Sequence, residues 1–177
     1  MSTQQSEDKA RIVDGLRFIP PGLRAWILND IPKEDFKGNI PWTPMAKSMS
    51  MTTVSIVTSA GMSLKTDPPF DMVREKRDPF CSDRSYRMIP RGTTEKDIDV
   101  NHLHINTKYI KQDINVILPL TRMAEFEKEG IIGRLAPTSY SFYGFQWQNT
   151  DFLKESFEPI SKQMKLEGVG AVLMTPA

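Results

Sequence analysis

Residues 52–59 read TTVSIVTS, and this run decides the fold. Side chains branched at Cβ fill the run, which stops at Ala60-Gly61, so it predicts a buried β-strand that ends in a turn. A second buried strand is expected near Ile132–Leu135, and Val169–Met174, with the sequence VGAVLM, predicts a third, apolar one. Strands that are apolar on both faces are typical of a parallel sheet that helices cover on both sides.

Helical segments separate these strands. Arg122–Glu129 predicts a short helix that Gly130 closes, and Asp151–Leu166 predicts a longer one that Thr150 or Asp151 can cap and Gly168 can end. Alternation of strands and helices favours an α/β layered fold with a mostly parallel sheet, either Rossmann-like or flavodoxin-like.

The chain is expected to have two parts. Residues 1–40 predict a tail and docking arm, and residues 41–177 predict the amino-terminal part of an α/β domain. Apolar residues at helical spacing predict a short amphipathic helix over 22–30, docked on the main body or, as the alternative, on another subunit. Residues 62–97 are polar and rich in proline, which predicts a long functional loop without regular structure, and 99–105 predicts a short strand.

Composition excludes several classes of protein. The chain has 23 Lys and Arg against 22 Asp and Glu, a net charge of +1, so it predicts neither a nucleic acid nor a membrane partner. No stretch approaches the roughly 20 apolar residues of a membrane span, and the amino terminus lacks an apolar signal core. Cys81 is the single cysteine, which excludes an internal disulfide framework and fits a reducing compartment. We therefore expect a cytoplasmic location.

The last predicted strand leads into the turn Thr175-Pro176-Ala177. In parallel α/β sheets, the chemistry gathers beyond the carboxyl ends of strands, where a turn opens the next helix. Because a covering helix is expected after this strand, we predict that the domain is incomplete and that the natural protein continues past Ala177.

Several short runs occur in a characteristic order and spacing. They are Ile40–Pro44 (IPWTP), Val57–Gly61 (VTSAG), Lys65–Asp71 (KTDPPFD), Tyr86–Pro90 (YRMIP), Asp113–Val116 (DINV), Leu135–Pro137 (LAP) and Gly168–Ala177 (GVGAVLMTPA). Together these runs resemble the glycine/sarcosine/betaine/D-proline reductase selenoprotein B family.

The resemblance implies a selenocysteine or a cysteine directly after a strand that ends like LMTPA, which is position 178 here. A selenol or thiol in such a turn faces free N–H groups and the positive end of a helix dipole, which favours its anionic form. The resemblance further implies reductive cleavage of a carbon–heteroatom bond in a small amino-acid-like substrate, with electrons from a thiol donor. It also implies assembly with other reductase subunits or with further copies of the chain. No cofactor is expected within the 177 residues, and these residues alone are expected to be inactive.

Two histidines attract attention because they are two residues apart on a predicted strand, which would place His102 and His104 on one side. The family commonly has a histidine at the position of His102, so the resemblance implies a catalytic proton donor or a substrate ligand there. A structural hydrogen bond is the alternative for His102. No metal site is expected, because further ligands for the pair are not apparent.

The remaining candidates would bind substrate. They are Asp67, Arg87, His104, Asp113, Asn115 and Thr175. Arg87 can bind a carboxylate with two parallel hydrogen bonds, although a solvated loop arginine is the alternative. For Asp113 and Asn115, the favoured interpretation is structural, with one side chain capping a turn and the other holding a loop backbone.

Other conspicuous residues point elsewhere. Cys81 lies between Asp78 and Asp83, which would raise the pKa of its thiol, so it is interpreted as a bystander. The aromatic cluster after Pro137 is typical of a core or a subunit interface, with Tyr143 able to line the site and Gly144 marking a close backbone approach.

Two other functions stay open. The main alternative is a non-catalytic accessory or binding protein of the same fold that pairs with another chain. A nucleotide-binding α/β domain is weakly supported, because the sequence has no glycine-rich phosphate loop of the Rossmann or Walker type.

Overall fold

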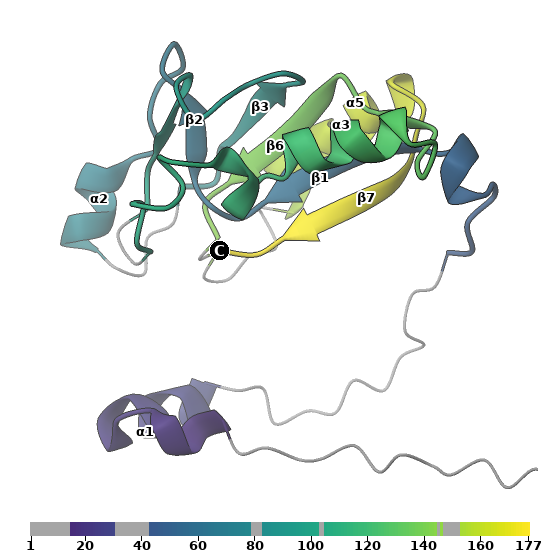
Figure 1. Ribbon diagram of the computed structural model, residues 1–177. Helices are drawn as coiled ribbons and strands as arrows, with labels where there is room; N and C mark the ends of the chain where they lie inside the picture. The colour runs from purple at the N-terminus through teal and green to yellow at the C-terminus, as the bar shows by residue number, and fades with distance from the viewer. Residues whose placement is uncertain (1–14, 31–42, 79–82, 103–104, 145, 147–152) are drawn as a thin grey trace, which may run out of the picture. The chain divides into compact units, whose positions relative to one another are not determined.

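The computed structural model describes residues 15–30, 43–78, 83–102, 105–144, 146 and 153–177 (Figure 1). The chain divides into two compact units, Met1–Trp42 and Thr43–Ala177, which are described separately.

The first unit contains the 3₁₀ helix η1 (Gly15–Phe18) and helix α1 (Pro21–Asp30). The helix predicted over 22–30 is therefore confirmed. Pro21 occupies its first position, where the missing N–H has no helical partner to lose. Leu23, Trp26 and Leu28 are exposed within this unit, and the docking role of the arm stays a prediction.

The second unit is built on a five-stranded sheet. Its strands are β1 (Thr53–Thr58), β3 (Tyr86–Pro90), β5 (Arg134–Leu135), β6 (Thr138–Phe142) and β7 (Val169–Thr175).

Strand β1 lies in the middle of this sheet. Val54 pairs in parallel with both Leu135 and Ala171, and Thr58 pairs in parallel with both Ser141 and Thr175. Because a residue has one neighbour on each side, β7 flanks one side of β1, while β5 and β6 share the other. Strand β3 pairs antiparallel to β6 at the far edge. The predicted α/β class with a mostly parallel sheet is confirmed.

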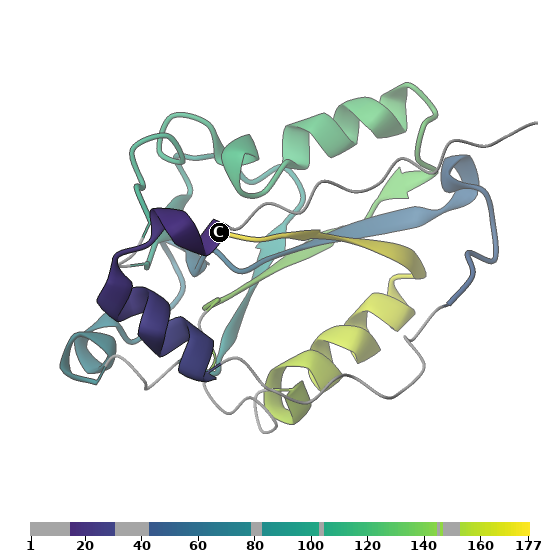
Figure 2. The ribbon, with the colours of Figure 1, turned by 90° about the horizontal axis from the view of Figure 1, so that it is seen from below.

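Helices α3 (Leu120–Lys128) and α5 (Glu158–Leu166) lie on opposite faces of the sheet (Figure 2). Alternate residues of β1 supply the two cores: Val54 and Ile56 pack in the larger cluster, and Val57 packs in the smaller one.

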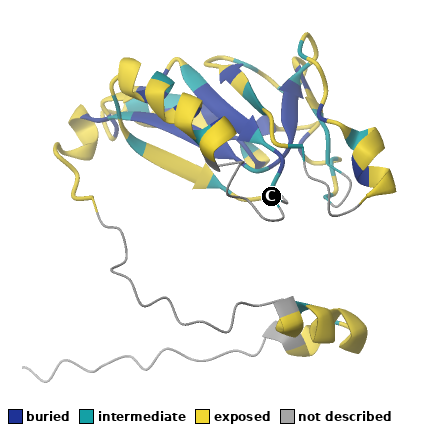
Figure 3. Ribbon diagram, turned by 180° about the vertical axis from the view of Figure 1, so that it is seen from behind, coloured by how far each residue is buried: buried dark blue, intermediate teal, exposed yellow. Residues whose placement is uncertain are grey.

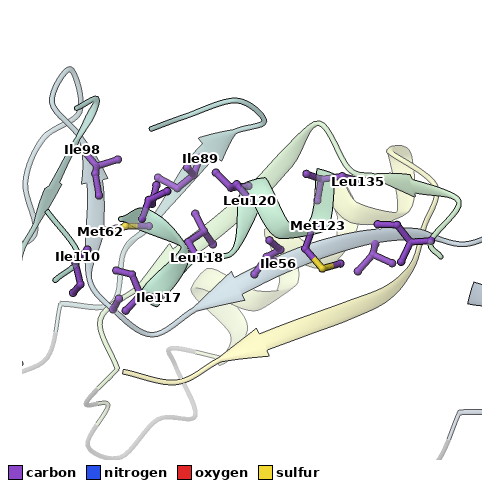
Figure 4. Packing of buried hydrophobic residues seen from close by; sticks show 14 residues of the cluster. Ile56, Met62, Ile89, Ile98, Ile110, Ile117, Leu118, Leu120, Met123 and Leu135 are labelled. Atoms are coloured by element: carbon purple, nitrogen blue, oxygen red, sulfur yellow. The ribbon is translucent and has the colours of Figure 1, made fainter. Parts of the chain in front are cut away.

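The larger cluster also takes in side chains from α3 and from the segments before it (Figure 4). Leu120 and Met123 of α3 join Leu118 there, and all three are buried. The smaller cluster joins Tyr140 to Ile160 and Met164 of α5. These two apolar layers hold the sheet rigid and thereby fix the positions of its strand ends.

The prediction of a structureless loop over 62–97 is wrong. This segment contains β2 (Met62–Leu64), helix α2 (Met72–Arg77) and β3. Strand β2 pairs antiparallel with β4 (Ile98–Val100) in a separate two-stranded sheet. Helix α2 begins because the carboxylate of Asp71 accepts a hydrogen bond from the N–H of Arg74, the usual arrangement at a helix start.

Three predicted elements differ in extent. The strand predicted over 99–105 ends at Val100, and the one predicted over 132–135 is reduced to β5. The predicted helix over 151–166 is a π-helical turn, η4 (Leu153–Phe157), followed by α5, with Gly168 at φ 71° beyond its end. Its predicted caps at Thr150 and Asp151 lie outside the described residues.

Strand β7 is confirmed, but its predicted burial is wrong. It forms an edge of the sheet, and Val172, Leu173 and Met174 are 42%, 38% and 55% exposed (Figure 3). Helices α3 and α5 therefore leave an apolar edge uncovered in the described structure.

No helix in the described part of the chain has the length and apolarity needed to cross a bilayer.

Candidate functional site

Three parallel strands end side by side in the second unit. Thr58, the last residue of β1, pairs with Ser141 near the end of β6 and with Thr175 at the end of β7. We call the residues at and directly after these ends the carboxyl edge: Ser59 and Gly61, Tyr143 and Gly144, and Thr175–Ala177. Figures 1 and 2 show α2 at this same end of the sheet.

Ser59 joins two of the strand ends. Its backbone N–H donates to the carbonyl oxygen of Thr175 at 3.2 Å, and its hydroxyl accepts from the N–H of Ala177 at 2.9 Å. The backbone that follows β7 is thereby held against the residue that follows β1.

Gly144 packs directly on Ser59. A Cβ atom at position 144 would lie 2.9 Å from the carbonyl oxygen of Ser59 and 3.0 Å from its Cβ. The close backbone approach predicted for Gly144 is therefore confirmed, and only a residue without a side chain fits there.

Gly61 performs a similar role beside β4. Its N–H donates to the carbonyl oxygen of Phe142, and its own carbonyl accepts from Asn101. Gly61 has φ 62°, and an added Cβ would lie 2.6 Å from the carbonyl oxygen of Asn101. Because Asn101 is held against Gly61, the residue that follows it, His102, lies beside the carboxyl edge.

His102 stacks on Tyr143. Their ring centroids are 5.0 Å apart with an interplanar angle of 27°, and His102 is half-buried. Because β4 ends at Val100, the prediction that His102 lies on a strand is wrong. His104 lies outside the described residues.

The Tyr143 hydroxyl donates a hydrogen bond to Oε1 of Glu75, and both residues are buried. Burial, followed by the hydrogen bond and the negative charge of Glu75, raises the pKa of Tyr143 above its usual value. The hydroxyl therefore stays protonated and acts as a donor across the physiological pH range.

Thr175 connects the carboxyl edge to the segment before α3. Its hydroxyl donates to the carbonyl oxygen of Ile117 at 2.7 Å and lies 3.4 Å from the carbonyl oxygen of Val57. The side chain that was predicted to bind substrate thus forms structural hydrogen bonds.

The structural interpretation of Asp113 and Asn115 is confirmed. Asp113 Oδ1 accepts from the N–H and the side-chain amide of Asn115, at the start of η3 (Ile114–Val116). Asn115 Oδ1 in turn accepts from the N–H groups of Thr121 and Arg122 in the first turn of α3. The hydrogen bonds from Asn115, the backbone one first, lower the pKa of Asp113.

Asp67 and Arg87 shape the loop between β2 and α2. Asp67 Oδ2 accepts from the N–H of Leu64, while Arg87 donates to the carbonyl oxygens of Pro68 and Pro69. The Arg87 guanidinium also lies 4.2 Å from the centre of the Phe70 ring. Arg87 pairs with Ser141, so its backbone is near the carboxyl edge, but its side chain is directed to this loop.

The structure therefore brings His102, Thr175 and the backbone of Arg87 to one end of the sheet. Asp113 and Asn115 support that end indirectly through η3. Sequence reasoning missed Ser59 and Glu75. The position of Ser59 directly after the strongest predicted strand was the available signal, whereas nothing in the sequence distinguished Glu75 from its charged neighbours.

Within the described residues, no group of three or more His, Cys, Asp or Glu side chains is placed to hold a metal ion. Cys81 lies outside the described residues.

Comparison with known proteins gives a consistent result. Residues 29–177 match the family described as glycine/sarcosine/betaine reductase selenoprotein B. The chain is 35% identical over 134 residues to the D-proline reductase subunit gamma of Acetoanaerobium sticklandii, covering 76% of this chain and 52% of that protein. It is 31% identical over 140 residues to the sarcosine reductase complex component B subunit beta of Peptoclostridium acidaminophilum, covering 77% and 30%.

A third relative is the glycine reductase complex component B subunit gamma of Carboxydothermus hydrogenoformans, 27% identical over 136 residues, covering 77% and 30%. The chain thus spans about half or less of the length of these curated relatives. No solved structure matches the chain. The match over 29–177 shows that this chain belongs to the glycine/sarcosine/betaine reductase selenoprotein B family.

Proposed function

We propose that this chain forms the amino-terminal part of a reductase subunit and that the reaction takes place at the carboxyl edge. The nucleophile is a selenocysteine or cysteine that follows Ala177. The chain matches only 52% and 30% of the lengths of two relatives, which supports a longer protein. The exposed apolar side chains of β7 support further polypeptide packing on that edge.

The overall reaction replaces a carbon–heteroatom bond of a small amino-acid-like substrate with a C–H bond. The selenolate or thiolate attacks the carbon, and the heteroatom leaves with the bonding electron pair and takes up a proton. One thiol of a dithiol donor then attacks the selenium or sulfur, and the carbon leaves with the bonding pair and takes up a proton to give the C–H bond. The second thiol displaces the nucleophile as the donor closes to a disulfide, so the donor supplies two electrons and two protons overall. The relatives are named as D-proline, sarcosine and glycine reductase subunits, which supports this class of substrate.

His102 is the proposed proton donor to the leaving heteroatom. It is half-buried and lies beside Gly61 and Tyr143 at the carboxyl edge, where a substrate would meet the nucleophile. We assign Asp113, Asn115 and Thr175 to holding the edge rather than to binding substrate, because their side chains are engaged with the fold. Other reductase subunits are the proposed partners, in keeping with the complexes named for the relatives.

One observation carries this proposal. Three parallel strands end together, and the hydroxyl of Ser59 holds the N–H of Ala177 at 2.9 Å. A residue directly after Ala177 would therefore leave the sheet at the place where α/β enzymes commonly bind their ligands.

The test is turnover by the protein produced anaerobically from its whole gene, together with its neighbouring subunits. D-proline, sarcosine, glycine and betaine are each offered with dithiothreitol, and the reduced product and the oxidised dithiol are both measured. One substrate should give equal amounts of both, and alkylation of the residue after Ala177 should abolish turnover. No turnover with any substrate, and no alkylated residue after β7, would instead support an accessory or binding protein.

A further inference from the structure

Helix α2 buries a carboxylate, although its other residues are exposed or half-buried. Glu75 is 7% exposed in the sequence MVREKR. Burial of a carboxylate is costly unless it gains hydrogen bonds, so this position calls for a specific partner. That partner is the hydroxyl of Tyr143, which follows β6.

Tyr143 is held on several sides. It is 1% exposed, it bridges antiparallel to Ala60 in the turn after β1, and its carbonyl oxygen accepts from the side-chain amide of Gln146. A Cβ atom at Gly61 would lie 3.2 Å from Tyr143 Cδ2, so the glycine is what lets the ring lie this close. With its hydroxyl bound to Glu75, the ring has a single orientation.

His102 is half-buried, so it is more accessible than the buried Glu75 and Tyr143. Its ring lies at 27° to the Tyr143 ring and 5.0 Å away, and the preceding residue is fixed by two hydrogen bonds. The N–H of Asn101 donates to Gly61, and its side-chain amide donates to Ser63 Oγ. The backbone before His102 and one face of its ring are therefore both constrained.

We infer that Glu75 and Tyr143 are positioning residues that orient the His102 imidazole toward the carboxyl edge. Glu75 fixes the hydroxyl end of Tyr143, Tyr143 presents a rigid ring face, and the half-buried His102 stacks on that face. The catalytic use of this orientation rests on the proposed function, but the stacking of His102 on Tyr143 can be measured independently. A proton donor must be within hydrogen-bond reach of the group it protonates, so an unoriented ring would transfer protons poorly.

The first experiment is NMR on the chain made from its full gene with imidazole-labelled histidine. H102Q identifies the His102 signal by its disappearance. The ring current of Tyr143 should displace this signal from its position in the unfolded chain. Y143L should remove the displacement, and Y143F should reduce it, because the aromatic face remains but the bond that orients it to Glu75 is lost. E75A should reduce it and E75Q should preserve it, since the glutamine oxygen can still accept from the tyrosine.

The second experiment is turnover by the assembled reductase. H102Q should lower kcat by about 10²–10⁴-fold, the usual contribution of general acid catalysis. Y143L should lower kcat by about 10- to 100-fold, as expected when a reacting group is displaced by about 1 Å, with little change in KM. E75Q should stay within about threefold of the wild type, whereas E75A and Y143F, which both break the Glu75–Tyr143 bond, should fall between E75Q and Y143L. Rescue by the conservative variant E75Q is what a general packing defect would not show.

The results separate the two proposals. If H102Q lowers kcat but Y143L changes neither the His102 signal nor kcat, the positioning inference is overturned and the proposed function stands. If the complex has no turnover, the proposed function fails, and the displaced signal, with its loss in Y143L, its reduction in E75A and its preservation in E75Q, still decides the positioning. A His102 signal at the unfolded position in the wild-type chain overturns the inference directly.

Discussion

The hydroxyl of Thr175 donates a 2.7 Å hydrogen bond to the carbonyl oxygen of Ile117, which lies 58 residues earlier in the chain. This bond joins the end of β7 to the short segment between η3 and α3. Asn115 of η3 accepts a hydrogen bond from the first turn of α3 and so fixes that segment. Two sets of hydrogen bonds therefore hold the end of β7 at the carboxyl edge, one to Ile117 before α3 and one to Ser59 after β1.

Replacement of Thr175 by valine tests the hydrogen bond to Ile117. T175V keeps the shape of the side chain but removes the donor, so the free energy of unfolding should fall by about 0.5–1.5 kcal/mol. Urea unfolding followed by circular dichroism measures it. T175S, which keeps the hydroxyl, is the matched control and should lose less than T175V. Equal losses in the two variants would mean that the bond to Ile117 contributes nothing.

Gly144 should not tolerate a side chain. The Cβ of G144A would lie 2.9 Å from the Ser59 carbonyl oxygen, so the backbone must shift, at a cost of about 1–3 kcal/mol in the free energy of unfolding. G22A is the control, because nothing lies within 4 Å of an added Cβ at that position of α1. A melting temperature of G144A equal to that of the wild type would contradict the close contact.

The two buried tyrosines of the sheet should respond differently to loss of the hydroxyl. Tyr140 Oη has no hydrogen-bond partner among the described residues, so Y140F should leave the free energy of unfolding unchanged or raise it. Y143F removes the bond to Glu75 and should lower the free energy of unfolding by about 1–3 kcal/mol. Guanidinium unfolding of both variants measures the difference, and a larger loss in Y140F would contradict this account.

Tyr140 should also make the stability of the protein fall at alkaline pH. Burial, followed by the charge of Glu167 and the neighbouring Tyr86, raises the pKa of Tyr140 to about 12, above the ordinary value of 10.0. A group whose pKa is raised by folding stabilises the native state below its unfolded pKa, and this contribution is lost as the pH rises toward the folded value. Wild-type stability should therefore decline between about pH 10 and 12, and Y140F should decline less over that range. Parallel curves for the two proteins would contradict the assignment.

Asp113 should make the stability of the protein depend on pH in the acid range. Its lowered pKa means that its ionised form stabilises the native state above the ordinary value of 3.8, and that this contribution disappears as the pH falls below it. D113N should therefore be less stable than the wild type at pH 6, with the difference shrinking below about pH 4. D99N, at an exposed position of β4, controls for the loss of one negative charge. A difference that stays constant from pH 6 to pH 3 would rule out the ionised cap.

The parts of the fold that were predicted correctly share a simple physical origin. Strand β1, α3 and β7 have either a continuous apolar run or helical spacing, and Gly130 and Gly168 mark two of the ends. Strand β6 was missed because its sequence is TSYSF, in which Ser139, Tyr140 and Ser141 are all buried. Ser141 is accommodated by a hydrogen bond from the N–H of Met62, 79 residues away, which no local pattern reveals.

The candidate site was predictable to a similar degree. The resemblance to the family drew attention to His102, which the structure places beside the carboxyl edge, and general residue preferences explained the hydrogen bonds of Asp113 and Asn115. The role of Glu75 could not be predicted, because its burial depends on Tyr143, which is 68 residues away. The exposure of β7 could not be predicted either, since an apolar strand has the same composition at an edge as in the centre of a sheet.

The sequence of the gene after codon 177 decides whether a nucleophile follows β7. We predict an in-frame UGA or a cysteine codon at position 178, followed by an open frame that encodes a further cysteine-bearing helix. A UAA or UAG codon at that position, or a frame that closes at once, would contradict a nucleophile after β7.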